Sequence, residues 1–374
     1  MGKKVVSAGH ICIDITPAIG GNRVSEIGQM LLPGKLINVG AADVHTGGSV
    51  ANTGLAMKIL GADVYLAGKT GDDAFGDMIQ SIVSRYGAEK GLIRKEGESS
   101  SYSVVLAVPG IDRIFLHHPG ANDTFTADDL SEELMKDTVL FHFGYPPLMK
   151  KMYENEGEGL LEVMKKAKAF GAATSMDLAA VDPASESGSA DWKKILEKVL
   201  PYVDIFVPSI EELYYMLDRQ GFDALQKRAD GRDVCEVLSF SEDIRPLADQ
   251  CMAMGTKILL IKCGAPGMYY RTSSEEMLQM IPQNLGLDTK VWADREGFEK
   301  SYVPERVLSG TGAGDTSIAA FLTSLLKGFP PEKCMQYAAA TGACCVAAYD
   351  ALSGLLPLEE LENRIRAGWA KNEF

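Results

Sequence analysis

Short apolar or β-branched runs alternate along the chain with longer segments in which apolar residues recur at helical spacing. The runs cover residues 4–15, 62–67, 139–143, 172–176, 204–207 and 257–263. One intervening segment places Leu160, Val163, Met164 and Ala167 on a single helical face. Segments of this kind are long enough to cross over between neighbouring parallel strands. The alternation therefore predicts an α/β fold built on a mostly parallel sheet.

Two stretches depart from this alternation. Residues 19–45 and 99–118 have the pattern of strands and turns, and the second forms a hairpin with arms at 102–108 and 113–117. We interpret both as one small β unit, a lid, inserted in the main domain. Residues 220–242 and 273–304 are charged and poorly periodic, which predicts surface insertions. No linker rich in Pro or Ser divides the chain, so we expect a single domain over residues 1–374.

The charge of the chain limits its partners. Its 374 residues include 37 Lys and Arg against 51 Asp and Glu, a net charge of −14. Such a negative field repels nucleic acid and anionic membranes, so neither is expected as a partner. The first apolar run is interrupted by Ser7, His10 and Asp14, which is untypical of a signal peptide. No apolar run approaches the ~20 residues of a membrane span, and we expect a cytoplasmic protein.

Cysteine and histidine give no metal pattern. The seven cysteines are odd in number and contain no Cys-x-x-Cys pair, so we expect free thiols, most of them small core residues. His117 and His118 are adjacent, and neighbouring residues of a strand point to opposite faces. We therefore favour a structural role for this pair over a metal site.

The sharpest candidate for chemistry is a glycine cluster at residues 309–315, which reads Ser-Gly-Thr-Gly-Ala-Gly-Asp. Apolar residues at helical spacing follow it, so a helix is predicted to begin near Gly314. Glycines before a helix allow backbone amides to converge, and the helix N-terminus favours an anion. The alternative is a packed turn. Asp315 would repel a phosphate in a plain anion cradle, but it suits a base that accepts the proton of an attacking hydroxyl.

A second glycine cluster, Gly47-Gly-Ser-Val-Ala-Asn52, leads into another predicted helix. The two glycines allow the backbone to approach a ligand closely, and Asn52 offers a donor and an acceptor to a polyol. Taken alone, this pattern favours a strand-to-helix turn with a polar cap over a ligand site.

Several segments in a fixed order resemble the ribokinase-like carbohydrate kinases, also called the PfkB family. The first and second family signatures are similar to residues 47–52, with Gly61 and Gly71 beyond them, and to residues 312–315. Between and around these signatures, further segments resemble the family's first strand, the end of its lid hairpin, an Asn-x-x-Glu motif and the turn that contacts the nucleotide: residues 9–14, 119–122, 208–212 and 262–267. The resemblance covers nearly the whole chain.

The resemblance implies a doubly wound, mostly parallel sheet flanked by helices, with a small β-sheet lid. It also implies transfer of a phosphoryl group from ATP to a hydroxyl of a sugar or nucleoside, with Asp315 as the base and the amides of Gly312, Ala313 and Gly314 as the anion hole. Glu212 would order Mg²⁺ through water. The substrate would be held by Asp14, Gly47, Gly48 and Asn52, and the nucleotide by Lys262, Gly264, Gly267 and Thr311. Family members with such a lid suggest a homodimer in which the lids pack together.

The chain differs from the family pattern in three places. Ser209 replaces the usual Asn of the metal and phosphate network. Ser309 and Gly310 replace a common Asp-Thr pair, so the sequence does not predict whether the monovalent cation site of many relatives is present. His10 stands where relatives often have a small or acidic residue. These differences motivate one alternative, a sugar or nucleotide sensor that kept the fold and lost turnover.

Two other enzyme classes fit poorly. A nicotinamide-dependent oxidoreductase should have Gly-x-Gly-x-x-Gly after its first strand, whereas here the first run continues to Ile13 and Asp14. A Walker-type kinase requires Gly-x-x-x-x-Gly-Lys-Ser/Thr, which the sequence does not contain.

Overall fold

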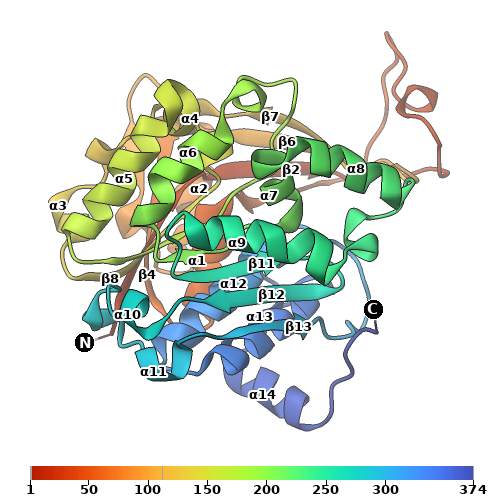
Figure 1. Cartoon of the computed structure of the whole chain (residues 1–374). Coiled ribbons are helices and arrows are strands. Elements are labelled where there is room, and N and C mark those ends of the chain that lie inside the picture. The colour runs from red at the N-terminus through yellow and green to blue at the C-terminus, as the bar shows by residue number, and fades with distance from the viewer. Residues whose placement is uncertain (1, 112, 374) are drawn as a thin grey trace.

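A nine-stranded sheet forms the centre of the molecule in a computed structural model that describes residues 2–111 and 113–373 (Figure 1). The strand order is β13-β12-β11-β10-β9-β8-β1-β4-β5. The strands from β11 to β5 are parallel, while β12 and β13 run antiparallel at one edge. Their bounds are β1 Lys4–Gly9, β4 Asp63–Gly71, β5 Ile93–Lys95, β8 Thr138–Gly144, β9 Ala173–Met176, β10 Ile205–Phe206, β11 Ile258–Lys262, β12 Gly267–Thr272 and β13 Glu296–Lys300.

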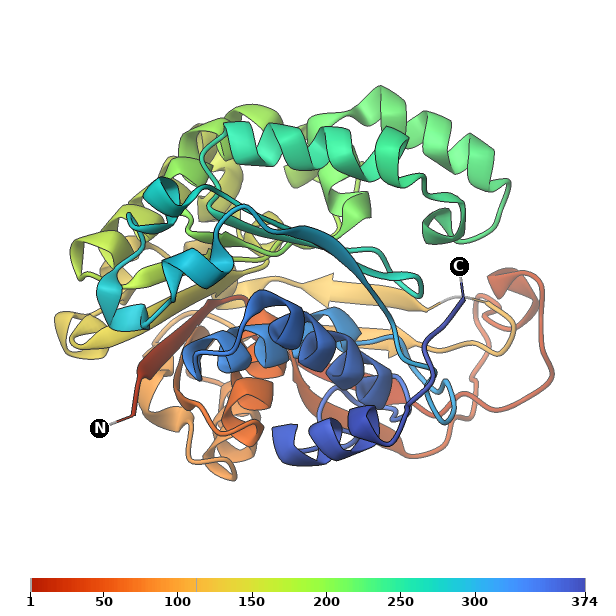
Figure 2. The same ribbon diagram turned by 60° about the horizontal axis from the view of Figure 1, so that its bottom comes forward.

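Helices cover both faces of this sheet, as Figure 2 shows. One face carries α1 Ser49–Ile59, α2 Ala74–Ser84, α10 Glu275–Leu278, α11 Thr289–Trp292, α12 Ala313–Leu326, α13 Pro331–Cys345 and α14 Leu358–Arg366. The other carries α3 Glu132–Met135, α4 Lys150–Tyr153, α5 Glu158–Ala169, α6 Trp192–Val199, α7 Ile210–Leu217, α8 Arg219–Ala229 and α9 Arg245–Ala253.

Successive residues of a strand point into two separate hydrophobic cores, one on each face of the sheet. Val5 and Leu260 pack into the core under α1 and α12, whereas their neighbours Val6 and Leu259 pack into the core under α5 and α9. A parallel sheet that is buried on both faces requires apolar residues at the odd and the even positions of its strands. This explains why its strands appear in the sequence as continuous apolar runs. The predicted doubly wound α/β fold is confirmed.

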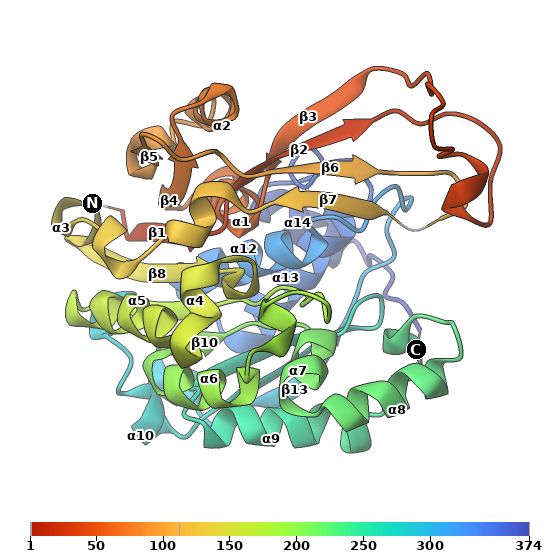
Figure 3. The ribbon, with the colours of Figure 1, turned by 90° about the horizontal axis from the view of Figure 1, so that it is seen from above.

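A smaller sheet of four strands lies beside the main one, and Figure 3 shows its strands side by side. Its order is β3-β2-β6-β7, with bounds β2 Cys12–Pro17, β3 Ala42–Gly47, β6 Tyr102–Leu106 and β7 Ile114–His118. The predicted hairpin is thus formed by β6 and β7; its turn includes residue 112, which lies outside the described residues.

The run at 4–15 is divided between the two sheets, so its prediction as one strand is wrong. The backbone of Gly9 has φ of 121°, and a Cβ there would lie 2.2 Å from the carbonyl oxygen of Gly144. The chain therefore leaves the main sheet after Gly9 and enters the smaller sheet at Cys12. The strands predicted across 19–45 are also wrong, except for β3. Residues 18–41 contain a short 3-10 turn, Ile27–Gln29, because Gly20, Gly21 and the Pro33-Gly34 pair interrupt regular pairing.

The two segments predicted as surface insertions carry regular elements. Residues 220–242 contain most of α8, whose Leu225 and Ala229 are buried. Residues 273–304 contain α10, α11 and the edge strand β13. All seven cysteines are free and buried, as expected. No helix of the described chain combines the length and the apolar character needed to cross a bilayer.

Candidate active site

A cavity of about 830 Å³ opens at the carboxyl ends of the parallel strands. Its lining includes His10, Tyr145 and Asp177, which directly follow β1, β8 and β9. Helix α1, on the way from β1 to β4, packs on one face of the sheet, and α5, between β8 and β9, packs on the other. The crevice where successive crossovers diverge to opposite faces is the usual ligand position of an open α/β sheet.

The predicted anion hole lies at the start of α12. Gly312 precedes this helix with φ of 77°, and a Cβ on it would lie 2.3 Å from the Cβ of Ala351, so the position requires glycine. The amide of Ala313 donates to the carbonyl of Gly310 at 3.3 Å, whereas the amides of Gly312 and Gly314 make no hydrogen bond to another described backbone group. These two amides are available to an anion. The helix begins one residue before the predicted position.

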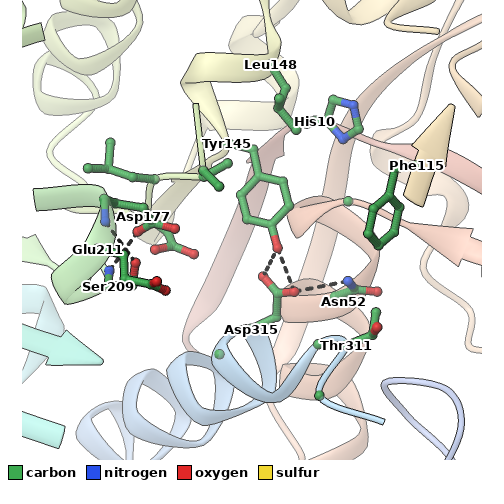
Figure 4. A pocket seen from close by; sticks show the side chains of 18 of the residues that line it. His10, Asn52, Phe115, Tyr145, Leu148, Asp177, Ser209, Glu211, Thr311 and Asp315 are labelled. Carbon is green, nitrogen blue, oxygen red and sulfur yellow. Dashed lines mark hydrogen bonds between the residues drawn. The ribbon is translucent and has the colours of Figure 1, made fainter. Parts of the chain in front are cut away.

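Asp315 lies in the first turn of α12 and is 3% exposed. Its Oδ2 accepts from Asn52 Nδ2 at 3.0 Å, and its Oδ1 accepts from Thr53 Oγ1 at 3.3 Å. The phenol of Tyr145 lies 2.8 Å from both oxygens, as Figure 4 shows. Burial raises the pKa of Asp315, although Lys262 and the three donors oppose the rise. A carboxyl group with a raised pKa is suited to accept a proton.

The second glycine cluster brings Asp14 next to α1. A Cβ on Gly47 would lie 2.1 Å from Asp14 Oδ2, so this glycine makes room for the carboxylate and does not itself line the cavity. Gly48, which precedes α1, has φ of 83°, and a Cβ there would lie 2.5 Å from the carbonyl oxygen of His10. Asp14, Gly48 and Asn52 all line the cavity of about 830 Å³. The amide nitrogen of Asn52 is already used by Asp315.

A histidine pair joins the smaller sheet to the end of β1. His10 Nε2 lies 3.3 Å from His117 Nε2, and His117 Nδ1 lies 3.0 Å from Ser103 Oγ. Burial lowers the pKa of both histidines, so both are neutral at pH 7. His118 contacts a different partner, Ser99 Oγ, at 2.8 Å. The adjacent histidines thus point away from each other, and His117 faces the cavity.

Lys262, at the end of β11, forms an ion pair with Asp177 at 2.6 Å. Asp177 is 1% exposed, and its Oδ2 has no hydrogen-bond partner among the described residues. Burial raises the pKa of Asp177, and the ammonium group of Lys262 opposes the rise. The sequence analysis missed Asp177. Its signal was its position directly after the apolar run at 172–176, where a parallel strand delivers side chains to the ligand edge.

Glu212 and Ser209 form a capping box at the start of α7. Glu212 Oε2 accepts from the Ser209 amide at 2.6 Å, and Ser209 Oγ accepts from the Glu212 amide at 3.2 Å. Ser209 therefore fixes the orientation of Glu212, which lines the larger cavity. The remaining oxygens of Glu212 and Asp177 are hard ligands that fit Mg²⁺. The described residues contain no group of three or more His, Cys, Asp or Glu placed to hold a metal ion directly.

A second cavity of about 410 Å³ adjoins the first, and Lys262, Gly264 and Gly314 line both. Gly264 and Gly267 have φ of 61° and 137°, and a Cβ on Gly267 would lie 2.2 Å from the carbonyl oxygen of Glu299. The far wall is formed by small residues of α13, Ala339, Gly342 and Ala343.

The remaining predicted residues divide between the two cavities. Ala313 and Gly267 line the second cavity. Thr311 lines the first, where its Oγ1 accepts from Arg113 of the β6–β7 hairpin. The structure thus brings all the predicted residues to one crevice, with Gly47 one layer behind it.

Comparison with known proteins agrees with this geometry. The family described as "pfkB family carbohydrate kinase" matches residues 3–357. An uncharacterized sugar kinase of Archaeoglobus fulgidus is 27% identical over 305 residues, which cover 80% of this chain and 98% of that protein.

Two solved structures share the fold. The fructokinase of Xylella fastidiosa with bound ATP has a TM-score of 0.70 at 20% identity and covers 98% of this chain and 99% of its own. The ribokinase of Arabidopsis thaliana, complexed with ribose and ATP, has a TM-score of 0.69 at 20% identity and covers 97% of this chain and 98% of its own. The resemblance seen in the sequence is confirmed: the chain belongs to the pfkB family of carbohydrate kinases.

Proposed function

We propose that this carbohydrate kinase transfers the γ-phosphoryl group of ATP to a sugar hydroxyl, with Asp315 as the general base. The observation that carries the proposal is the position of Asp315 in the first turn of α12, three residues after Gly312 and one residue after Gly314. The backbone amides of these two glycines are free, and both glycines line the same cavity as Asp315. A base and an anion hole on one helix end can act on the two sides of a single transfer. Asp315 accepts the proton of the attacking hydroxyl while the amides stabilise the charge on the phosphoryl group.

We assign the second cavity to the base and ribose of ATP, with the phosphates passing Gly264, Gly314 and Lys262 into the first cavity. Three observations support this direction. Lys262, Gly264 and Gly314 border both cavities, Gly267 and the small residues of α13 leave room for a planar ring, and Lys262 supplies a positive charge at the junction. Mg²⁺, held through water by Glu212 and Asp177, would neutralise phosphate charge there.

We assign the opposite side of the first cavity to the acceptor. Asp14, Gly48, His10 and His117 line it, and the smaller sheet supplies Asp14 and His117. This arrangement fits a lid that covers the acceptor and excludes water during transfer. Six carboxylate residues line the same cavity: Asp14, Asp177, Asp182, Glu211, Glu212 and Asp315. They favour a neutral polyol over a sugar acid or a sugar phosphate.

We also propose a homodimer through the smaller sheet. Its strands β3 and β7 expose Val44 and Leu116, aligned on one face of this sheet, at 41% and 54%, and the 18–41 segment exposes Leu36 at 88%. Exposed apolar side chains gathered on one unit mark an interaction surface. Analytical ultracentrifugation should give twice the mass of one chain, and Val44→Ser with Leu116→Ser should give the monomer.

The test of function is formation of ADP from ATP and Mg²⁺ over a panel of neutral sugars, sugar acids and nucleosides, with the phosphorylated product identified by mass spectrometry. We expect at least one neutral sugar to be phosphorylated. Binding of a sugar or nucleotide without any phosphorylated product would overturn the proposal in favour of a sensor with the same fold.

A further inference from the structure

The carboxylate of Asp315 already contacts three hydrogen-bond donors. Asn52 donates to Oδ2, Thr53 donates to Oδ1, and the Tyr145 phenol lies 2.8 Å from both oxygens. A carboxylate offers about four lone-pair positions, two on each oxygen. Asn52 and Thr53 take one on each oxygen, and the phenol, which has a single proton, occupies the space in front of the other two. An acceptor hydroxyl must therefore replace one of these donors before it can give its proton to Asp315.

Tyr145 is the most exposed of the three donors. Thr53 is completely buried and Asn52 is 7% exposed, and both are held on helix α1. Tyr145 is partly exposed and lines the cavity. In Figure 4 its ring points across the cavity toward Asp315, with His10 and Leu148 on its far side.

We propose that Tyr145 occupies the acceptor-hydroxyl position on Asp315 while no acceptor is bound and yields that position when the acceptor enters. The inference rests on the proposed role of Asp315 as the base. It makes Tyr145 a positioning residue that acts through Asp315 and competes with the substrate for it.

The backbone of Tyr145 supports a dedicated role for its side chain. Its φ and ψ are 66° and 42°, the left-handed region that bulky residues rarely adopt. Such strained positions gather at functional sites. Pro146 and Pro147 follow and restrict the chain there. The phenol is therefore released by rotation of the side chain, with the backbone held in place.

Occupation of Asp315 protects ATP from water. A water molecule on Asp315 could attack the γ-phosphorus: its oxygen would bond to phosphorus, the bond to the bridging oxygen would break, ADP would leave, and the water proton would pass to Asp315. The Tyr145 phenol fills the place from which that water would react. A sugar can displace the phenol because it brings several hydroxyls to the cavity, whereas a water brings one.

The test is Tyr145→Phe, assayed first as ATP hydrolysis without sugar. We expect this rate to rise about threefold to tenfold, the equivalent of one net hydrogen bond, and the KM of D-fructose as probe acceptor to fall by a similar factor. The acid limb of kcat/KM should also move to higher pH, because the variant loses a donor that lowers the pKa of Asp315. The other titratable groups that interact with Asp315 stay in place: Lys262 on β11, Asp177 after β9 and Cys345 on α13.

Two further variants make the result decisive. Tyr145→Asn suits the left-handed backbone and cannot reach Asp315, so it should raise hydrolysis as Tyr145→Phe does. Tyr214→Phe removes a matched buried bond, from Tyr214 to Asp243 at 2.8 Å, and should leave hydrolysis and KM unchanged. A lower kcat with unchanged hydrolysis in both Tyr145 variants would overturn the proposal, because Tyr145 would then stay on the base during transfer. Equal changes in Tyr214→Phe would also overturn it. Failure of the wild type to phosphorylate any acceptor would instead refute the proposed function.

Discussion

Replacement of Asp315 by Asn removes the proposed base and leaves its surroundings almost unchanged. The amide oxygen can accept from Asn52 and Tyr145, and the amide nitrogen can donate to Thr53 Oγ1, which lies 3.3 Å from the Asp315 oxygen that it would replace. A threonine hydroxyl accepts as well as donates, so the contact with Thr53 is kept with its direction reversed. Asp315→Ala would instead leave three donors unpaired, at about 1–3 kcal/mol for each buried group.

The expected loss of rate follows from the chemistry of the acceptor. A sugar hydroxyl is a weak nucleophile until its proton is accepted, and general-base catalysis contributes about 10²–10⁴ in rate. At 1.36 kcal/mol for each factor of ten, this corresponds to about 2.7–5.4 kcal/mol in activation free energy. The amides of Gly312 and Gly314 are untouched, so ATP affinity should stay within about threefold, less than one net hydrogen bond to a charged group.

The assay is steady-state turnover of the best acceptor, with ATP affinity measured by calorimetry and folding by thermal melting. Asp243→Asn is the matched control, because Asp243 is a buried carboxylate that accepts from Tyr214 outside the cavity. We expect the control to keep wild-type kcat. An Asp315→Asn enzyme that melts earlier but retains kcat within tenfold of wild type would refute the reasoning, since Asp315 would then merely stabilise the helix N-terminus.

Four other outcomes follow from the site. Lys262→Met leaves the buried Asp177 without a counter-ion and should lower the free energy of unfolding, measured in urea, by about 3 kcal/mol. Asp177→Asn, added to Lys262→Met, should restore most of this loss, and a double variant that restores none would contradict the pairing. The KM of the acceptor should rise only in acid, once the pH falls below the lowered pKa of both His10 and His117, because their bond is lost when both rings are protonated; His117→Gln should remove this dependence. Deletion of the hairpin tip at Gly110 should raise the KM of the acceptor more than that of ATP, and equal effects would count against a lid. Chelation should abolish turnover and Mg²⁺ should restore it, whereas stoichiometric zinc in the active protein would contradict oxygen ligation.

The sequence predicts the parts of the site that depend on local backbone chemistry. The glycines at 312 and 48 are needed for positive φ at two helix starts, and this requirement leaves a visible pattern along the chain. Apolar runs locate the strands for the same reason, because a sheet covered on both faces needs them.

Tyr145 and Asp177 could not be found in this way. Each is a single polar residue after a strand, and neither belongs to a local motif. They reach Asp315 and Lys262 because β8 and β9 lie beside β1 and β10 in the sheet, an order that sequence spacing does not contain. The sequence pattern could not show, for a similar reason, that the run at 4–15 is divided between two sheets. Gly9 ends β1 because of its contact with Gly144, a residue of another strand.

The balance of charge at the junction of the two cavities is the reason why we expect a cation to accompany the nucleotide. Asp177, Glu212 and Asp315 all raise the pKa of Lys262, against the effect of burial, so three carboxylates face one ammonium group. A triphosphate adds further negative charge, and like charges in a poorly solvated cavity repel strongly. Two free amides at the start of α12 supply partial charges that cannot offset this excess alone. A divalent cation bound through water reverses the local balance, so we expect free ATP to bind much more weakly than ATP with Mg²⁺.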